Sequence, residues 1–123
     1  MRISAYGGSS PTAESYIETY RGMTGNFQTI TIDFYNLITN YNSTSVYFRV
    51  YSRAYRDLTA PLTLISEKSN LTNPELFTTT GIKKITLNTN ASGQLVEFVV
   101  RIGCTATNSS SASVNVINVY YGG

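Results

Sequence analysis

The chain has 123 residues, of which 41% are hydrophobic and 13% charged, and its formal net charge is +2. This length suits a single domain with one hydrophobic core, and ten tyrosines with five phenylalanines argue against a disordered chain. The single cysteine excludes an internal disulfide, and the small net charge argues against a nucleic-acid partner.

The first ten residues, MRISAYGGSS, join a strand-like piece to a pair of glycines. They lack the apolar core of a signal peptide, and no segment has the roughly 18 apolar residues of a membrane helix. We therefore expect one domain over residues 1–123 with no membrane partner. Residues 1–10 form a candidate flexible arm, which could pair with the sheet edge of a neighbouring subunit. An ordinary first strand within the domain's own sheet is the favoured interpretation.

The next segment breaks the pattern of the rest of the chain and predicts a short helix over Pro11–Arg21. Ser10 is a suitable N-cap, Pro11 suits the first helical position, and Gly22 could end the helix. The apolar and aromatic residues also follow helical spacing, at Ala13, Tyr16, Ile17 and Tyr20.

Beyond this segment, apolar and polar residues alternate with a period of two, which indicates β-strands. The predicted strands are Phe27–Phe34, Val46–Tyr55, Leu62–Ser66, Ile82–Asn88, Gln94–Cys104 and Ser113–Tyr121. In the last strand the apolar phase changes between Val116 and Ile117, so we expect a β-bulge there.

Six to eight short strands separated by turn residues predict an all-β fold, an antiparallel β-sandwich with one short N-terminal helix. Jelly-roll and immunoglobulin-like topologies both fit the pattern. A small closed barrel is the second choice.

The residue types needed for common catalytic and metal sites are missing. The chain has no histidine, which removes the usual general base and the usual metal ligand, so we expect no enzyme, metal or cofactor. A two-carboxylate site is formally possible, but Glu97 is expected to pair with Arg101 or a neighbouring lysine. Cys104 lies in phase with apolar residues and is expected to be buried and inert.

One strand carries two different faces. Val46, Phe48 and Val50 form a predicted core face that ends in the small residues Ser52 and Ala54. The opposite face is an alternating row of tyrosine and arginine, the types enriched in protein interfaces. We predict it as the binding surface, formed by Tyr47, Arg49, Tyr51, Arg53 and Tyr55. It could be a protein interface or bare solvated surface, which rank equally, or a platform for a sugar, which ranks third.

The composition resembles that of an extracellular β protein, with 42 Ser, Thr and Asn residues, yet the single cysteine allows no internal disulfide and we expect no export signal in the first ten residues. A virion component would reconcile these features, because it folds in the host cytoplasm and meets the outside only after release. The favoured function is therefore a non-enzymatic structural protein of a phage or virus, such as a capsid decoration, fibre or tail module. Its partners would be copies of itself or other virion proteins.

Two alternatives remain open. The first is a carbohydrate-binding, lectin-like β-sandwich module with a glycan partner and an extracellular or cell-surface location. The second is a surface-filament or pilin-like subunit, which would require a leader before Met1.

Overall fold

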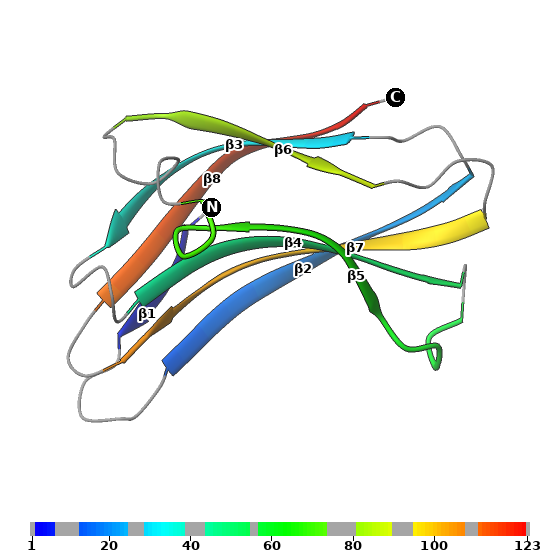
Figure 1. The fold of residues 1–123 in the computed structure, drawn as a ribbon, viewed down its shortest axis with the longest axis horizontal. Coiled ribbons are helices and arrows are strands. Elements are labelled where there is room, and N and C mark those ends of the chain that lie inside the picture. The colour runs from blue at the N-terminus through cyan, green and yellow to red at the C-terminus, as the bar shows by residue number, and fades with distance from the viewer. Residues whose placement is uncertain are drawn as a thin grey trace.

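The fold consists of eight antiparallel strands in two sheets. The computed structural model describes residues 2–6, 13–24, 29–38, 44–54, 57–73, 81–89, 95–107 and 111–122. The strands are β1 (Arg2–Tyr6), β2 (Ala13–Thr24), β3 (Thr29–Ile38), β4 (Thr44–Ala54), β5 (Thr63–Ser69), β6 (Lys83–Asn88), β7 (Leu95–Ala106) and β8 (Ser111–Gly122). Sheet A has the order β1-β8-β3-β6 and sheet B the order β2-β7-β4-β5. Figure 1 shows the sheets stacked as two layers, so the predicted β-sandwich is confirmed.

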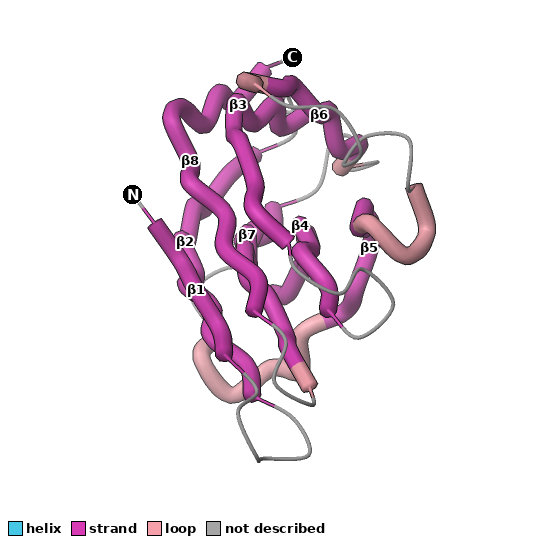
Figure 2. Tube along the Cα trace, turned by 90° about the vertical axis from the view of Figure 1, so that its left-hand side faces the viewer, coloured by secondary structure: helices cyan, strands magenta, loops and turns pink. Residues whose placement is uncertain are grey.

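The winding of the chain settles the topology. Among the described strands, β4 and β5 are the one consecutive pair that hydrogen-bonds within a sheet, and every other connection passes to the opposite sheet. This is the eight-strand jelly-roll arrangement. Immunoglobulin sheets instead contain several consecutive pairs. Each sheet also keeps two edge strands, so the architecture is not a closed barrel (Figure 2).

The core lies between the sheets, where the alternating apolar side chains meet. On β4 the predicted core face is confirmed, since Val46, Phe48 and Val50 are fully buried. The rings of Phe48 and Phe34 pack across the two sheets with their centroids 4.6 Å apart. Cys104 is also buried among apolar residues, and this burial raises the pKa of its thiol to about 11.

The predicted bulge is present. Along the β3–β8 pairing, Asp33 lies opposite Asn118 but Phe34 lies opposite Val116, so Ile117 is the extra residue of β8. The register then lets Val119 pack against the core, while the side chain of Ile117 is exposed. One inserted residue therefore restores the inward phase, as the pattern indicated.

The helix predicted over Pro11–Arg21 is wrong from Ala13 onward, because Ala13–Thr24 form β2; Pro11 and Thr12 lie outside the described residues. β2 pairs with β7 along twelve residue pairs, and this pairing outweighs a weak local helix preference. Tyrosine, isoleucine and threonine also suit strands.

Residues 2–6 form an ordinary first strand within the domain's own sheet, which was the favoured interpretation, since β1 pairs with β8 in sheet A. Within the described part of the chain, no helix has the length and apolarity needed to cross a membrane.

Candidate functional site

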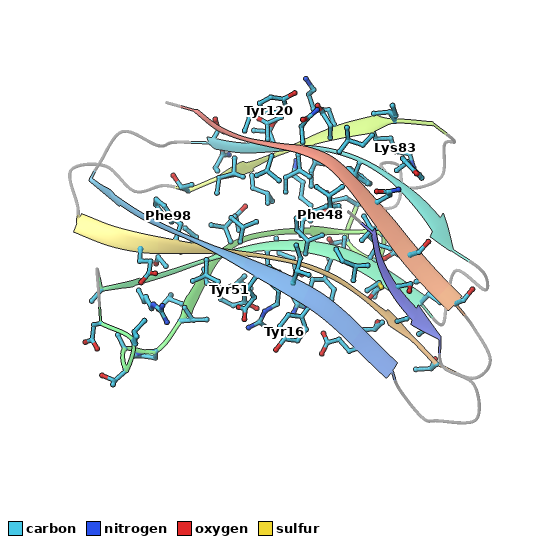
Figure 3. All side chains as sticks on the ribbon, turned by 180° about the vertical axis from the view of Figure 1, so that it is seen from behind. Tyr16, Phe48, Tyr51, Lys83, Phe98 and Tyr120 are labelled. Atoms are coloured by element: carbon cyan, nitrogen blue, oxygen red, sulfur yellow. The ribbon has the colours of Figure 1, made fainter. Side chains whose placement is uncertain are left out.

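The predicted tyrosine and arginine row lies on the outer face of sheet B, at the centre of the sheet. β4 sits between β7 and β5, so its outward side chains have neighbours on both sides. Figure 3 shows Tyr51 and Tyr16 on the side of sheet B that faces away from sheet A, whereas Phe48 and Phe98 point between the sheets. Tyr55, the last residue of the row, lies outside the described residues.

Tyr47 is part of this face but is not exposed, since its side chain retains only 2% accessibility. Its ring lies over Gly103 of the neighbouring strand β7, where a Cβ would stand 2.5 Å from the tyrosine Oη and 2.7 Å from Tyr16 Cβ. The absence of a side chain at Gly103 is therefore what allows the phenol end of the Tyr47 ring to lie against β7. We define Tyr47, Gly103 and Tyr16 as the tyrosine floor.

The hydroxyl of Tyr47 reaches the edge strand β2. It donates a hydrogen bond to Glu14 Oε2 at 2.5 Å. Burial, together with this carboxylate, raises the pKa of Tyr47 well above its ordinary value, because both disfavour a phenolate. The tyrosine thus ties the central strand β4 to β2 across β7.

Arg49 covers the tyrosine floor from the next position of β4. Its guanidinium carbon lies 4.0 Å from the centroid of the Tyr47 ring, and its Nε donates to Glu67 Oε2 on β5 at 2.5 Å. Burial by itself would lower the pKa of Arg49, but the Glu67 carboxylate outweighs it and the pKa is raised. Arg49 is therefore a fixed cation stacked on a ring.

Arg101 of β7 holds two tyrosines in place. Its guanidinium carbon lies 4.6 Å from the Tyr16 ring centroid and 4.8 Å from that of Tyr51. It donates through Nη2 and Nε to Glu18 Oε2, at 3.0 and 3.2 Å, and through Nη1 to the Tyr51 hydroxyl at 3.3 Å. One guanidinium thus contacts two rings and one carboxylate.

A third ion pair lies at the far end of the face. Arg53 Nε donates to Glu97 Oε2 at 2.9 Å, and both side chains are largely buried, at 9% and 14% accessibility. Glu97 was expected to pair with Arg101 or a lysine, and this prediction is wrong. Its partner is Arg53, because β4 places Arg53 directly opposite Glu97. The expected structural use of Glu97 does fit this buried pair.

The residues of β2 were missed at the sequence level. Tyr16, Glu14 and Glu18 all contribute to the face, and Tyr16 is its most exposed described ring at 47% accessibility. They were interpreted as helical, although their spacing of two residues is also the signal of one side of a strand. Gly103 was missed because its role depends on a neighbouring strand.

This face combines exposed aromatic rings with ordered polar groups. Tyr16 and Tyr51 offer rings to solvent, and Leu64 of β5, opposite Tyr51, is exposed beside them. Ion pairs and stacking hold the polar groups in fixed positions, which lowers the entropy cost of binding. Among the described residues, no three His, Cys, Asp or Glu side chains gather in a way that could hold a metal ion.

Comparison with known proteins gives similarity of fold. No protein-family model matches the sequence, and no curated protein sequence matches it. Among solved structures, the carbohydrate-binding module CBM28, specific for non-crystalline cellulose, has a TM-score of 0.53 at 13% identity. The module TmCBM61, in complex with β-1,4-galactotriose, has a TM-score of 0.51 at 7% identity.

A third similar structure comes from work on promiscuous specificity in carbohydrate-binding modules of the β-sandwich superfamily, with a TM-score of 0.50 at 14% identity. These alignments cover 89%, 96% and 89% of this chain, respectively, and 67%, 68% and 42% of the other chains. The chain thus spans about two thirds of two of these proteins and under half of the third. At these identities the likeness shows a shared β-sandwich fold.

Proposed function

We propose that this protein is a non-catalytic carbohydrate-binding module that holds a glycan on the outer face of sheet B. The fold similarity to carbohydrate-binding modules supports this proposal over the assembly role that the sequence analysis favoured. No cofactor is required for such binding. A module of this kind would work outside the cell or at a cell surface, where polysaccharides occur.

The observation that carries the proposal is the pair of tyrosines on either side of Arg101. Tyr16 and Tyr51 belong to different strands, yet both rings contact the same guanidinium. Sites for small molecules combine apolar and aromatic side chains with a few fixed polar groups, and a tyrosine supplies both an apolar ring face and a polar hydroxyl. A sugar ring suits such a site, because its C–H groups can contact a tyrosine ring and its hydroxyls can bond to the polar side chains beside that ring.

The test is binding to glucans and galactans with matched tyrosine variants. Isothermal titration would measure the affinity for soluble β-1,4-galactan and hydroxyethyl cellulose, and a pull-down would measure binding to non-crystalline cellulose. We expect Tyr16→Ala and Tyr51→Ala each to weaken binding about tenfold, which corresponds to about 1.4 kcal/mol.

Tyr35→Ala and Tyr120→Ala are the controls, because both tyrosines are exposed on the opposite sheet. Equal losses in all four variants would contradict the proposed location of the site. Absence of glycan binding, combined with a stable oligomer in light scattering, would instead favour the assembly role.

A further inference from the structure

The outer face of sheet B carries more negative than positive side chains, although the chain as a whole carries a net positive charge. The chain is basic, with a net charge of +2 and a calculated isoelectric point near 8.7. The described side chains of this face comprise three arginines and four glutamates, a local balance of −1. The arginines are Arg49, Arg53 and Arg101, and the glutamates are Glu14, Glu18, Glu67 and Glu97.

Each of these three arginines is already paired with a carboxylate. The pairs join β4 to β5, β4 to β7 and β7 to β2, with nitrogen–oxygen distances of 2.5, 2.9 and 3.0 Å. An anionic ligand that approached one of these guanidinium groups would meet a carboxylate already bound to it, and displacing that glutamate would leave its carboxylate without a partner in a partly buried place. Glu14 adds a fourth negative charge, whose contact is the neutral hydroxyl of Tyr47.

We propose that these carboxylates make the site selective for uncharged glycans and exclude glycans that carry carboxylate or sulfate groups. This inference rests on the proposed function and specifies its ligand class. Glu18 and Glu67 are then specificity-determining residues: they keep Arg101 and Arg49 stacked on tyrosine rings and cancel their charge. Neutral sugar hydroxyls pay no such electrostatic cost when they approach the face.

Net charge alone would predict the opposite preference, because a basic protein attracts polyanions. The lysines of β6 belong to the other sheet, and Lys84 is 65% accessible there beside Asp33. Weak attraction of polyanions would therefore be expected at sheet A. The two effects can be separated because they depend on different faces.

The experiment compares the affinity for a neutral polymer with that for its anionic derivative. The probes are hydroxyethyl cellulose and β-1,4-galactan, each measured beside the carboxymethylated form of the same backbone. Titrations at about 20 mM salt keep the electrostatic effect unscreened. We expect the protein to bind the neutral polymer for which its affinity is higher at least tenfold more tightly than the anionic form of that polymer.

The variants Glu18→Gln and Glu67→Gln each remove one carboxylate and leave an arginine with its full charge. We expect either to narrow the neutral-to-anionic affinity ratio to about threefold or less. Asp33→Asn is the matched control, because it raises the net charge by the same amount on the opposite sheet. Its affinity ratio should equal that of the unmodified protein, and circular dichroism would verify the fold of every variant.

Equal affinity for both polymer forms, or tighter binding of the anionic form, would overturn this inference and leave the proposed function intact. An equal shift in Asp33→Asn would also overturn it, because net charge would then explain the preference. If neither polymer form bound, the proposed function and this inference would fail together.

Discussion

The outer faces of sheet A and sheet B carry similar residue types, but the side chains of sheet B are more buried and more closely paired. On sheet A, Tyr35 and Tyr120 are exposed, and Lys84 reaches Asp33 at 3.8 Å while keeping 65% of its accessibility. Figure 3 shows Tyr120 on the side of sheet A that faces away from the core. The face of sheet B instead has a buried tyrosine and three close ion pairs.

The difference arises from how closely side chains of separate strands are joined. In sheet A, Tyr35 bonds to Asn115 on the neighbouring strand, and the described contact across three strands is long, with Lys84 Nζ 5.9 Å from the centroid of the Tyr120 ring. In sheet B, Tyr47 spans β4, β7 and β2 through its ring over Gly103 and its bond to Glu14. Composition alone therefore does not distinguish a solvated face from an ordered one. The four predictions that follow test this contrast with matched substitutions on the two faces.

The largest difference is expected between Tyr47→Ala and Tyr35→Ala. Removing the buried ring of Tyr47 should lower the free energy of unfolding by about 3–5 kcal/mol, as for a core aromatic residue. Removing the exposed ring of Tyr35 should cost about 1 kcal/mol or less. Urea unfolding with a common m-value would measure both. Similar costs for the two variants would show that the outer face of sheet B is no more ordered than that of sheet A.

The next largest effect is expected when a single methyl group is added at Gly103. Gly103→Ala would place a Cβ against the Tyr47 ring and should cost about 1–3 kcal/mol. In sheet A, Gly122→Ala would place a Cβ 3.2 Å from Thr29 Oγ1, the one close contact among the described residues. A small side-chain shift can relieve it, so about 0.5 kcal/mol or less is expected.

A double mutant makes this prediction specific to the tyrosine floor. In a Tyr47→Ala background the added methyl of Gly103→Ala has space, so the two costs should not add. Full additivity would mean that the methyl group disturbs some part of the protein other than Tyr47.

The sequence predicted the interior of the fold more fully than its outer face. Alternation along β4 and β7 identifies Phe48, Val50 and Phe98 as core residues, because the period of a strand is local information. The change of phase in β8 likewise reveals the bulge at Ile117. β2 was mistaken for a helix because the N-cap and proline signals of Ser10 and Pro11 are also local, whereas its pairing with β7 is not.

The arrangement of the outer face of sheet B depends on strand order, which the sequence does not reveal. Four residues of β4 were identified as one row, but their partners come from distant segments. Arg101 and Glu18, for example, are 83 residues apart. The burial of Tyr47 requires a glycine at the matching position of β7, and only the register places Gly103 there.

A third prediction compares the ion pairs of the two faces. Glu97→Gln removes the charge that faces the largely buried Arg53, so the free energy of unfolding should fall by about 1–2 kcal/mol. Asp33→Asn breaks the pair with the exposed Lys84 and should cost about 0.5 kcal/mol or less. Thermal and urea unfolding at pH 7 would measure both. A cost for Asp33→Asn as large as that for Glu97→Gln would contradict the contrast.

The smallest expected effect concerns pH. Because burial and Glu14 raise the pKa of Tyr47 in the folded state, its contribution to stability is fully present below the unfolded-state value near 10. Above that pH the unfolded chain loses its phenolic proton first, so stability falls as the pH rises. Between pH 9 and 11 the parent protein should therefore lose about 1 kcal/mol more stability than Tyr47→Phe, which has no phenol to ionise.

Cys104 would add to the same trend, because burial raises the pKa of its thiol to about 11. Both proteins should therefore carry Cys104→Ala, and their urea midpoints should be compared at pH 9, 10 and 11. If the two stability curves stay parallel across this range, the Tyr47 hydroxyl ionises as easily in the folded protein as in the unfolded chain. Tyr47 would then be open to water, and the outer face of sheet B would resemble that of sheet A.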